Sequence, residues 1–132
     1  MHTPLQIAAV YIALNAIVTL ALAFNAVRAR GRTKVLLGDG GNEAMLRAMR
    51  AHSNNVEYVP LTLLMLLVLA LLQTSVLVLH IVGLCLLLGR IAHGLGLATA
   101  SGMSAGRGLG IALTVIAMLV AIVFLLIKAF VF

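Results

Sequence analysis

The sequence predicts an all-α integral membrane protein, a single four-transmembrane-helix bundle, on two observations. Of 132 residues, 64% are hydrophobic and 9% are charged, and the mean hydropathy is +1.22. A soluble domain is about 45–50% apolar and about 25% charged, and a chain this short cannot bury so much apolar surface. Four apolar stretches also approach the length of about 20 residues that spans a bilayer. A soluble globular protein, a disordered chain and a disulfide scaffold are therefore excluded.

The first apolar stretch covers residues 5–27, and Pro4 suits a first helical turn because the missing N–H costs nothing there. The stretch lacks a basic leading segment, is longer than the apolar part of a signal peptide, and is followed by further spans. We therefore expect a transmembrane helix here and not a signal peptide.

A basic, glycine-rich loop is expected over residues 28–41, with Asn42 as the N-cap of a second helix over 43–72. The polar run 73–75 forms a tight turn, and a third helix follows over 76–95. A segment rich in small residues separates it from the fourth helix, 109–132. The whole chain, 1–132, is predicted to be one domain.

The charged residues predict an orientation. Four of the nine Lys and Arg residues lie between 28 and 34, and basic loops stay on the cytoplasmic side of a membrane. Arg107, between the third and fourth helices, agrees with this side. Both termini and the turn at 73–75 are then expected on the opposite side. With no tryptophan and only two tyrosines to stack on bases, the net charge of +6 does not indicate a nucleic-acid partner.

The second helix carries the densest polar pattern. At about 100° per residue, six of its side chains fall on one stripe: Glu43, Arg47, Arg50, Asn54, Glu57 and Tyr58. Counting about 20 residues back from Leu72 puts the hydrocarbon boundary near Ser53, so Glu57 lies at membrane depth. An ionisable group at that depth usually faces a partner or a wet cavity, and Pro60 predicts a helix kink beside it.

The topology brings further polar residues to the same boundary. They form a predicted basic cup with one acid: Arg30, Arg50, Asn54, Glu57, Tyr58, Arg90, His93 and Arg107. Such a cup suits a small, multiply charged anion that also carries an amine. The same residues also fit a structural polar network between helices, and Arg107 fits a simple cytoplasmic anchor. Arg90 is expected to be structural, paired with an acid or capping the third helix.

Other residues are expected to be structural. Cys85 lies among leucines, where a thiol stays protonated and inert. The histidines lack the spacing of a metal site, so no metal is predicted. The small-xxx-small pairs Gly102/Gly106 and Gly106/Gly110 are typical of close helix packing.

The motif in the second helix resembles the signature of the MAPEG family, the membrane-associated proteins of eicosanoid and glutathione metabolism. In this chain the motif reads Arg50-Ala-His52-x-Asn54-x-x-Glu57-Tyr58-x-Pro60. Chain length, four spans and the basic first loop match as well, and the glycine-rich segments are more similar to the bacterial branch. The resemblance implies a homotrimer in the bacterial inner membrane. It also implies glutathione as a co-substrate, bound between subunits on the cytoplasmic side.

The resemblance also implies roles for individual residues. By position, Arg50, Asn54, Glu57 and Tyr58 would hold glutathione, with Glu57 taking its amino group. The contacts Arg30, His52 and His93 would complete the binding site, His52 serving a neighbouring subunit. Arg107 would be the catalytic residue, whose permanent charge favours the glutathione thiolate. The family's two tyrosines near the end of the third helix are replaced here by His93 and Leu97.

The implied function is a glutathione transferase or peroxidase that acts on a lipophilic electrophile arriving from the membrane lipids. A non-catalytic membrane protein that binds glutathione or acts as a scaffold is the alternative. A small transporter using Glu57 as a proton site is a third choice. The nearly apolar outer halves of all four spans argue against a transporter.

Overall fold

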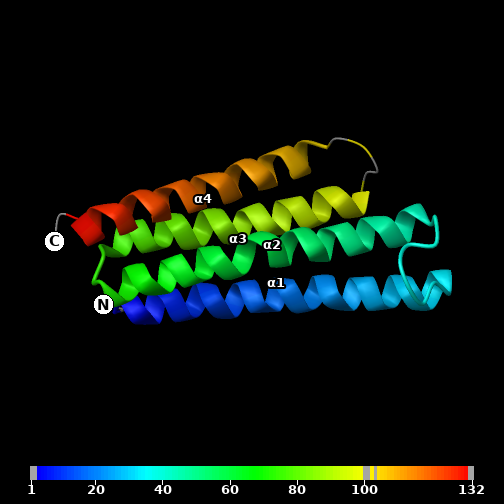
Figure 1. The fold of residues 1–132 in the computed structure, drawn as a ribbon, viewed down its shortest axis with the longest axis horizontal. Helices are drawn as coiled ribbons and strands as arrows, with labels where there is room; N and C mark the ends of the chain where they lie inside the picture. Colours follow the sequence, from blue (N-terminus) through cyan, green and yellow to red (C-terminus); the bar gives the residue numbers. More distant parts are fainter. Residues whose placement is uncertain (1–2, 100–101, 103, 131–132) are drawn as a thin grey trace.

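The computed structural model describes residues 3–99, 102 and 104–130, and they form an antiparallel bundle of four helices (Figure 1). The helices are α1 (Pro4–Thr33), α2 (Glu43–Leu71), α3 (Val76–Thr99) and α4 (Ala105–Phe130). All four are long and apolar enough to cross a membrane. The all-α, four-span prediction is therefore confirmed.

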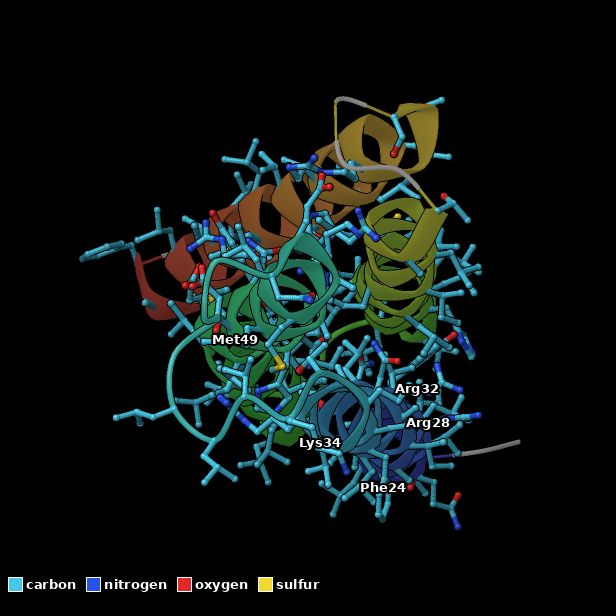
Figure 2. The ribbon with its side chains drawn as sticks, turned by 90° about the vertical axis from the view of Figure 1, so that its right-hand side faces the viewer. Phe24, Arg28, Arg32, Lys34 and Met49 are labelled. Atoms are coloured by element: carbon cyan, nitrogen blue, oxygen red, sulfur yellow. The ribbon has the colours of Figure 1, made fainter. Side chains whose placement is uncertain are left out.

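The helices pack with α2 and α3 in the middle and α1 and α4 on opposite sides (Figure 1). In the described part of the chain, α1 and α4 do not touch each other. The C-terminal ends of α1 and α3 and the N-terminal ends of α2 and α4 lie at one end of the bundle, and the α2–α3 turn lies at the other (Figure 1). We call the first of these the basic end, because Arg28 and Arg32 at the end of α1 and Lys34 directly after it lie there (Figure 2).

Three helix ends differ from the prediction. α1 continues to Thr33, so the first residues of the expected loop 28–41 are helical. Arginine and alanine are good helix formers, and the helix stops only at Lys34, which adopts the left-handed conformation at φ 59°. α3 likewise extends to Thr99, and α4 begins at Ala105, where Ser104 Oγ accepts a hydrogen bond from the Arg107 N–H. Hydropathy detects only the apolar part of a helix. The helix ends predicted from it therefore lie several residues inside the ends that the structure shows.

Other expected features are present. Asn42 caps α2 by accepting a hydrogen bond from the Met45 N–H at 3.1 Å. Pro4 lies in the first turn of α1, and Thr3 and Gln6 complete a capping box around it. α2 stays helical through Pro60. The last residues of the predicted fourth span, 131–132, lie outside the described residues.

Glycines let α3 and α4 approach closely near the basic end. A Cβ built on Gly110 would lie 2.6 Å from both the Gly89 carbonyl oxygen and His93 Cβ. A Cβ on Gly106 would lie 3.0 Å from the Ala92 carbonyl oxygen. The prediction of close packing is thus confirmed for Gly106 and Gly110. It is wrong for Gly102, which precedes α4 and has nothing within 4 Å of its Cβ position.

We expect Gly110→Ala to destabilise the bundle by about 1–3 kcal/mol, because the added methyl group forces two packed backbones apart. Gly108→Ala is the matched control in the same helix, since a Cβ there meets nothing within 4 Å. Alanine should leave that variant as stable as the parent, or more so by about 0.5–1 kcal/mol. Thermal unfolding in detergent, followed by circular dichroism, compares them. Equal melting temperatures for the two variants would contradict the close α3–α4 contact.

Candidate functional site

A polar cavity of about 320 Å³ opens at the basic end between α2, α3 and α4. Its lining residues are Leu46, Arg47, Arg50, Asn54, His93, Leu97, Arg107 and Ile111. We call it the α2–α4 cavity. Its volume lies within the range of small-molecule sites, about 300–1,000 Å³.

Each helix supplies neighbouring positions to the cavity. Residues three or four apart share a helix face, which brings Arg50 and Asn54 together on α2. The same spacing places His93 with Leu97 on one face of α3. It also places Arg107, in the first turn of α4, on one face with Ile111. Four predicted site residues, Arg50, Asn54, His93 and Arg107, therefore line one cavity.

Behind the cavity, the guanidinium of Arg90 joins three helices. Arg90 is only 2% exposed, although it is charged. Its Nη1 donates to Asn54 Oδ1 at 2.8 Å and to the Asn54 carbonyl oxygen at 3.4 Å. Its Nε donates to Thr114 Oγ1 at 3.1 Å, and the Thr114 hydroxyl donates to the Gly110 carbonyl oxygen at 2.8 Å. Arg90 on α3 thus holds α2 and α4 at a defined distance from each other.

The aromatic ring of Tyr58 adds a further contact to this guanidinium. Arg90 Cζ lies 5.6 Å from the ring centroid, which is cation–π distance. Tyr58 is consequently turned toward Arg90 and does not line the α2–α4 cavity. The structural role predicted for Arg90 agrees with these contacts. The prediction that Arg90 pairs with an acid is wrong. Its guanidinium contacts an amide, a hydroxyl and an aromatic ring instead.

Three other predicted site residues lie outside the cavity. Glu57 is exposed on the surface of the single chain, so the acid is not enclosed in the cup that the sequence predicts. The Nη1 of Arg30 donates to three carbonyl oxygens of the α1–α2 loop, the shortest at 3.1 Å to Gly38. His52 is half-buried on α2, away from the cavity lining. The roles of these three in a site between subunits stay predictions.

The cavity is strongly cationic. Three arginines line it, and no lining residue is an acid. Arg47 forms an ion pair with Glu43 at 3.4 Å, one turn earlier on α2. Arg107 Nη1 donates to the Gly102 carbonyl oxygen at 2.7 Å, and Arg50 has no ion pair in the described part of the chain. The site can therefore receive an anion with at least two negative groups.

The sequence did not identify two residues that matter here. Arg47 was placed on the polar stripe of α2 but was not named as a site residue, although it lines the cavity. Thr114 lies in the apolar fourth span, four residues after Gly110, and is the second partner of Arg90. In the sequence, Thr114 is visible only as a single hydroxyl residue in an apolar helix. Such a hydroxyl can bond to the carbonyl oxygen four residues earlier in its own helix, so it does not indicate a partner in another helix.

We expect Thr114→Val to destabilise the bundle, because the buried Arg90 charge loses a partner at a cost of about 1.5–3 kcal/mol. Thr62→Val is the matched control. Thr62 is also fully buried, but among the described residues its hydroxyl bonds only to the Tyr58 carbonyl oxygen in its own helix. Chemical unfolding of both variants in detergent measures the difference. If both variants lose the same stability, the Arg90–Thr114 hydrogen bond does not support the bundle.

Comparison with known proteins agrees with this architecture. The MAPEG family matches residues 8–127, a stretch that includes most of all four helices. Two relatives, each described as inner membrane protein YecN, come from Escherichia coli strain K12 and from Escherichia coli O6:H1. Each is 34% identical over 88 residues, which cover 67% of this chain and 67% of the relative. No solved structure matches the chain. The chain belongs to the MAPEG family.

Proposed function

We propose that the protein binds glutathione in the α2–α4 cavity and uses it as a glutathione transferase or peroxidase on lipophilic electrophiles. The observation that carries this proposal is the convergence of Arg50, Asn54 and Arg107 from two helices on one cationic cavity. Glutathione carries two carboxylates, one amine and one thiol, which matches a site of several arginines. Membership of the MAPEG family adds support, since the family commonly binds glutathione.

The hydrogen bonds of Arg90 prepare Asn54 for this task. Because Asn54 Oδ1 accepts from Arg90, the Nδ2 group remains as the donor of that amide. A donor in a cationic cavity suits a ligand carboxylate or a peptide carbonyl. The arginine fork of Arg50 pairs with a carboxylate in two parallel hydrogen bonds, which lysine cannot do.

Glu57 supports a site shared between subunits. It is exposed on the lateral face of α2 and lies below the predicted hydrocarbon boundary near Ser53. A carboxylate at the bilayer centre costs about 2.5–3.5 kcal/mol on insertion scales, so such a group normally faces protein or water. We propose a homotrimer in which a neighbouring subunit covers this face and supplies Arg30 and His52 to the glutathione site. In that arrangement Glu57 would receive the ligand's amino group.

The proposed chemistry needs no nucleophile from the protein. Glutathione loses its thiol proton to water, and the thiolate, stabilised by the Arg107 guanidinium, forms a C–S bond with the electrophile as the leaving group departs. With a peroxide, the thiolate instead cleaves the O–O bond, and a second glutathione then displaces water from the resulting sulfenic acid to give glutathione disulfide. The cavity supplies proximity by holding the thiol at the membrane boundary, where a lipophilic substrate arrives. The protein therefore acts by electrostatic stabilisation and positioning.

A non-catalytic glutathione-binding protein is the second candidate, and one observation favours it. His93 and Leu97 form the α3 wall of the cavity, and neither carries a hydroxyl that could hydrogen-bond the sulfur. Without a hydroxyl, the lining groups left to contact the thiol are the Arg107 guanidinium and the His93 imidazole. Turnover, measured separately from binding, distinguishes the two candidates.

We also propose that the protein lies in the bacterial inner membrane, as the names of its relatives state for them. The basic end would face the cytoplasm, following the positive-inside rule. Both chain termini and the α2–α3 turn would face the opposite side. Glutathione would then enter from the cytoplasm.

We expect glutathione to raise the melting temperature of the detergent-purified protein, because a ligand that binds the folded state stabilises it. Arg50→Gln should abolish this shift by removing a carboxylate contact. Arg32→Gln is the control: it removes the same charge at the same end, but Arg32 does not line the α2–α4 cavity. Equal shifts in the parent and in Arg50→Gln would contradict the proposed site.

The same preparations decide between the two candidates when glutathione conjugation to a chloronitrobenzene is followed. For the enzyme, Arg107→Ala should lower the rate of conjugation about a hundredfold, the typical effect of losing one preorganised charge stabiliser. Arg32→Gln should conjugate like the parent. A parent protein that binds glutathione without accelerating conjugation would support the non-catalytic candidate instead.

A further inference from the structure

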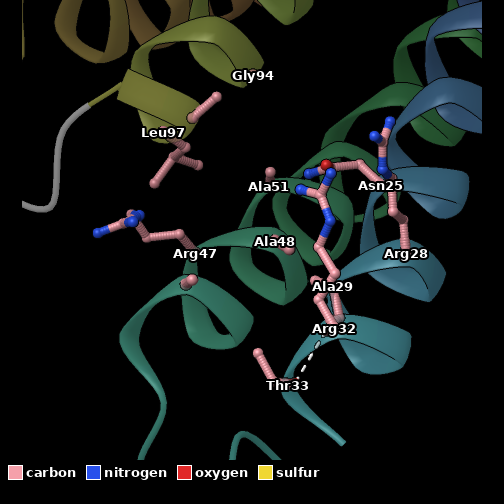
Figure 3. A pocket seen from close by; sticks show the side chains of 12 residues that line it. Asn25, Arg28, Ala29, Arg32, Thr33, Arg47, Ala48, Ala51, Gly94 and Leu97 are labelled. Atoms are coloured by element: carbon pink, nitrogen blue, oxygen red, sulfur yellow. Dashed lines mark hydrogen bonds between the residues drawn. The ribbon is translucent and has the colours of Figure 1, made fainter.

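A second cavity at the basic end is not used by the proposed function. It has a volume of about 240 Å³ and lies between α1, α2 and α3 (Figure 3). Its lining residues are Asn25, Arg28, Ala29, Arg32, Thr33, Ala44, Arg47, Ala48, Ala51, Gly94, Leu97 and Ala98. We call it the α1–α3 cavity. It is open because alanines and a glycine occupy the positions where the three helices face one another.

Two arginines of α1 give this cavity its charge. Arg28 and Arg32 lie one turn apart, and Asn25 lies one turn before Arg28, so the three share a helix face. Figure 3 shows the Arg28 and Arg32 side chains extending in the same direction from α1 and the Asn25 side chain extending across toward Arg32, while the Arg47 guanidinium points away from them. Within residues 3–99, 102 and 104–130, neither Arg28 nor Arg32 has a hydrogen bond or an ion pair from its guanidinium. Two unpaired cations beside an amide make a ready site for an anion.

An apolar groove continues from this cavity along α1 and α3. It has a volume of about 310 Å³ and is lined by Ile17, Val18, Ala21, Leu22, Asn25, Arg90, Ile91, Gly94, Leu95 and Ala98. Asn25, Gly94 and Ala98 line both spaces, so the two adjoin each other. From Ile17 to Asn25 the groove follows α1 for roughly 12 Å. One end of this combined site is therefore cationic and the other is hydrocarbon-like.

The position of the combined site in the membrane matches a lipid. Arg28 directly follows the apolar stretch 5–27, so its guanidinium lies at the level of the lipid phosphates. The groove extends from there toward the middle of the bilayer. Basic pockets between transmembrane helices on the cytoplasmic side are typical binding sites for anionic lipid headgroups. A free anion could use the arginines but would leave the groove empty.

We propose that the α1–α3 cavity and its groove bind one anionic phospholipid. The phosphate pairs with Arg28 and Arg32, the Asn25 amide donates to the headgroup, and one acyl chain fills the groove. This site is distinct from the α2–α4 cavity, with which it shares only the lining residues Arg47 and Leu97. The proposal does not depend on glutathione binding.

Native mass spectrometry of the detergent-purified protein tests the headgroup contact. Phosphatidylglycerol and phosphatidylcholine with identical acyl chains are added, and bound copies are counted. We expect the parent to retain phosphatidylglycerol preferentially and Arg32→Gln to retain it about tenfold less, as for the loss of one charge-assisted hydrogen bond. Lys34→Gln is the control, because it removes one charge two residues away without touching the cavity lining.

A second pair of variants tests the acyl-chain groove. Ala21→Phe fills the groove and should also weaken phosphatidylglycerol retention, while Ala16→Phe, on the same helix but outside the groove lining, should not. Glycerol phosphate, which has the headgroup chemistry without acyl chains, is added in a separate arm. We expect it to bind far more weakly than the lipid and to be unaffected by Ala21→Phe.

Each contrary result overturns the proposal. Equal retention of the two lipids by the parent, or equal losses in Arg32→Gln and Lys34→Gln, would mean only nonspecific attraction to a basic surface. Lipid binding that Ala21→Phe leaves intact, together with glycerol phosphate binding that Arg32→Gln abolishes, would mean a site for a soluble anion. Arg32→Gln and Ala21→Phe both change exposed positions, so each variant should keep the fold of the bundle. Their melting temperatures check that it does.

Discussion

The hydrogen bonds of Arg90 are the interaction on which the geometry of the basic end depends. Removing a charged group from water costs several kcal/mol, so a buried guanidinium is stable only when polar partners surround it. Asn54 from α2 partners Nη1, Thr114 from α4 partners Nε, and Tyr58 adds its ring, while Nη2 has no hydrogen-bond partner among the described residues. Because Asn54 also lines the α2–α4 cavity, and His93 lies one turn after Arg90, the cavity walls are positioned by the same contact.

Glycine makes this contact possible. The Arg90 side chain can reach Thr114 only because α3 and α4 meet backbone to backbone beside it. A Cβ on Gly89 would lie 2.9 Å from Thr114 Oγ1 and from the Gly110 carbonyl oxygen. Small residues at a membrane helix interface gain close van der Waals packing, since the hydrophobic effect does not drive helices together in lipid. Here they also bring a buried charge within hydrogen-bond distance of its partner.

The sequence predicted the fold well and the site in part, for physical reasons. Hydropathy registers the apolar centre of a span, so the number and order of the helices followed from it. It does not register polar helix ends, which is why α1 was expected to end before Arg28 and in fact continues to Thr33. Helical spacing predicts that Arg50 and Asn54 share a face of α2. It does not determine how α2 is rotated about its axis relative to the neighbouring helices. The exposure of Glu57 and the choice of Thr114 as a partner of Arg90 required that rotation.

The arginines of the basic end divide between two cavities, and α2 stands between them. Arg50 and Arg107 line the cavity proposed for glutathione, Arg28 and Arg32 line the cavity proposed for a lipid headgroup, and Arg47 lies at the wall of both. The two proposals together assign the net charge of +6 to orientation in the membrane and to two separate anion sites. An experimental structure of the protein purified with glutathione would show directly whether the α2–α4 cavity binds this ligand. We expect glutathione in the α2–α4 cavity, with a carboxylate at Arg50 and the sulfur nearest Arg107, and with a neighbouring subunit completing the site. Glutathione bound elsewhere, or a cavity that stays empty at saturating glutathione, would contradict it.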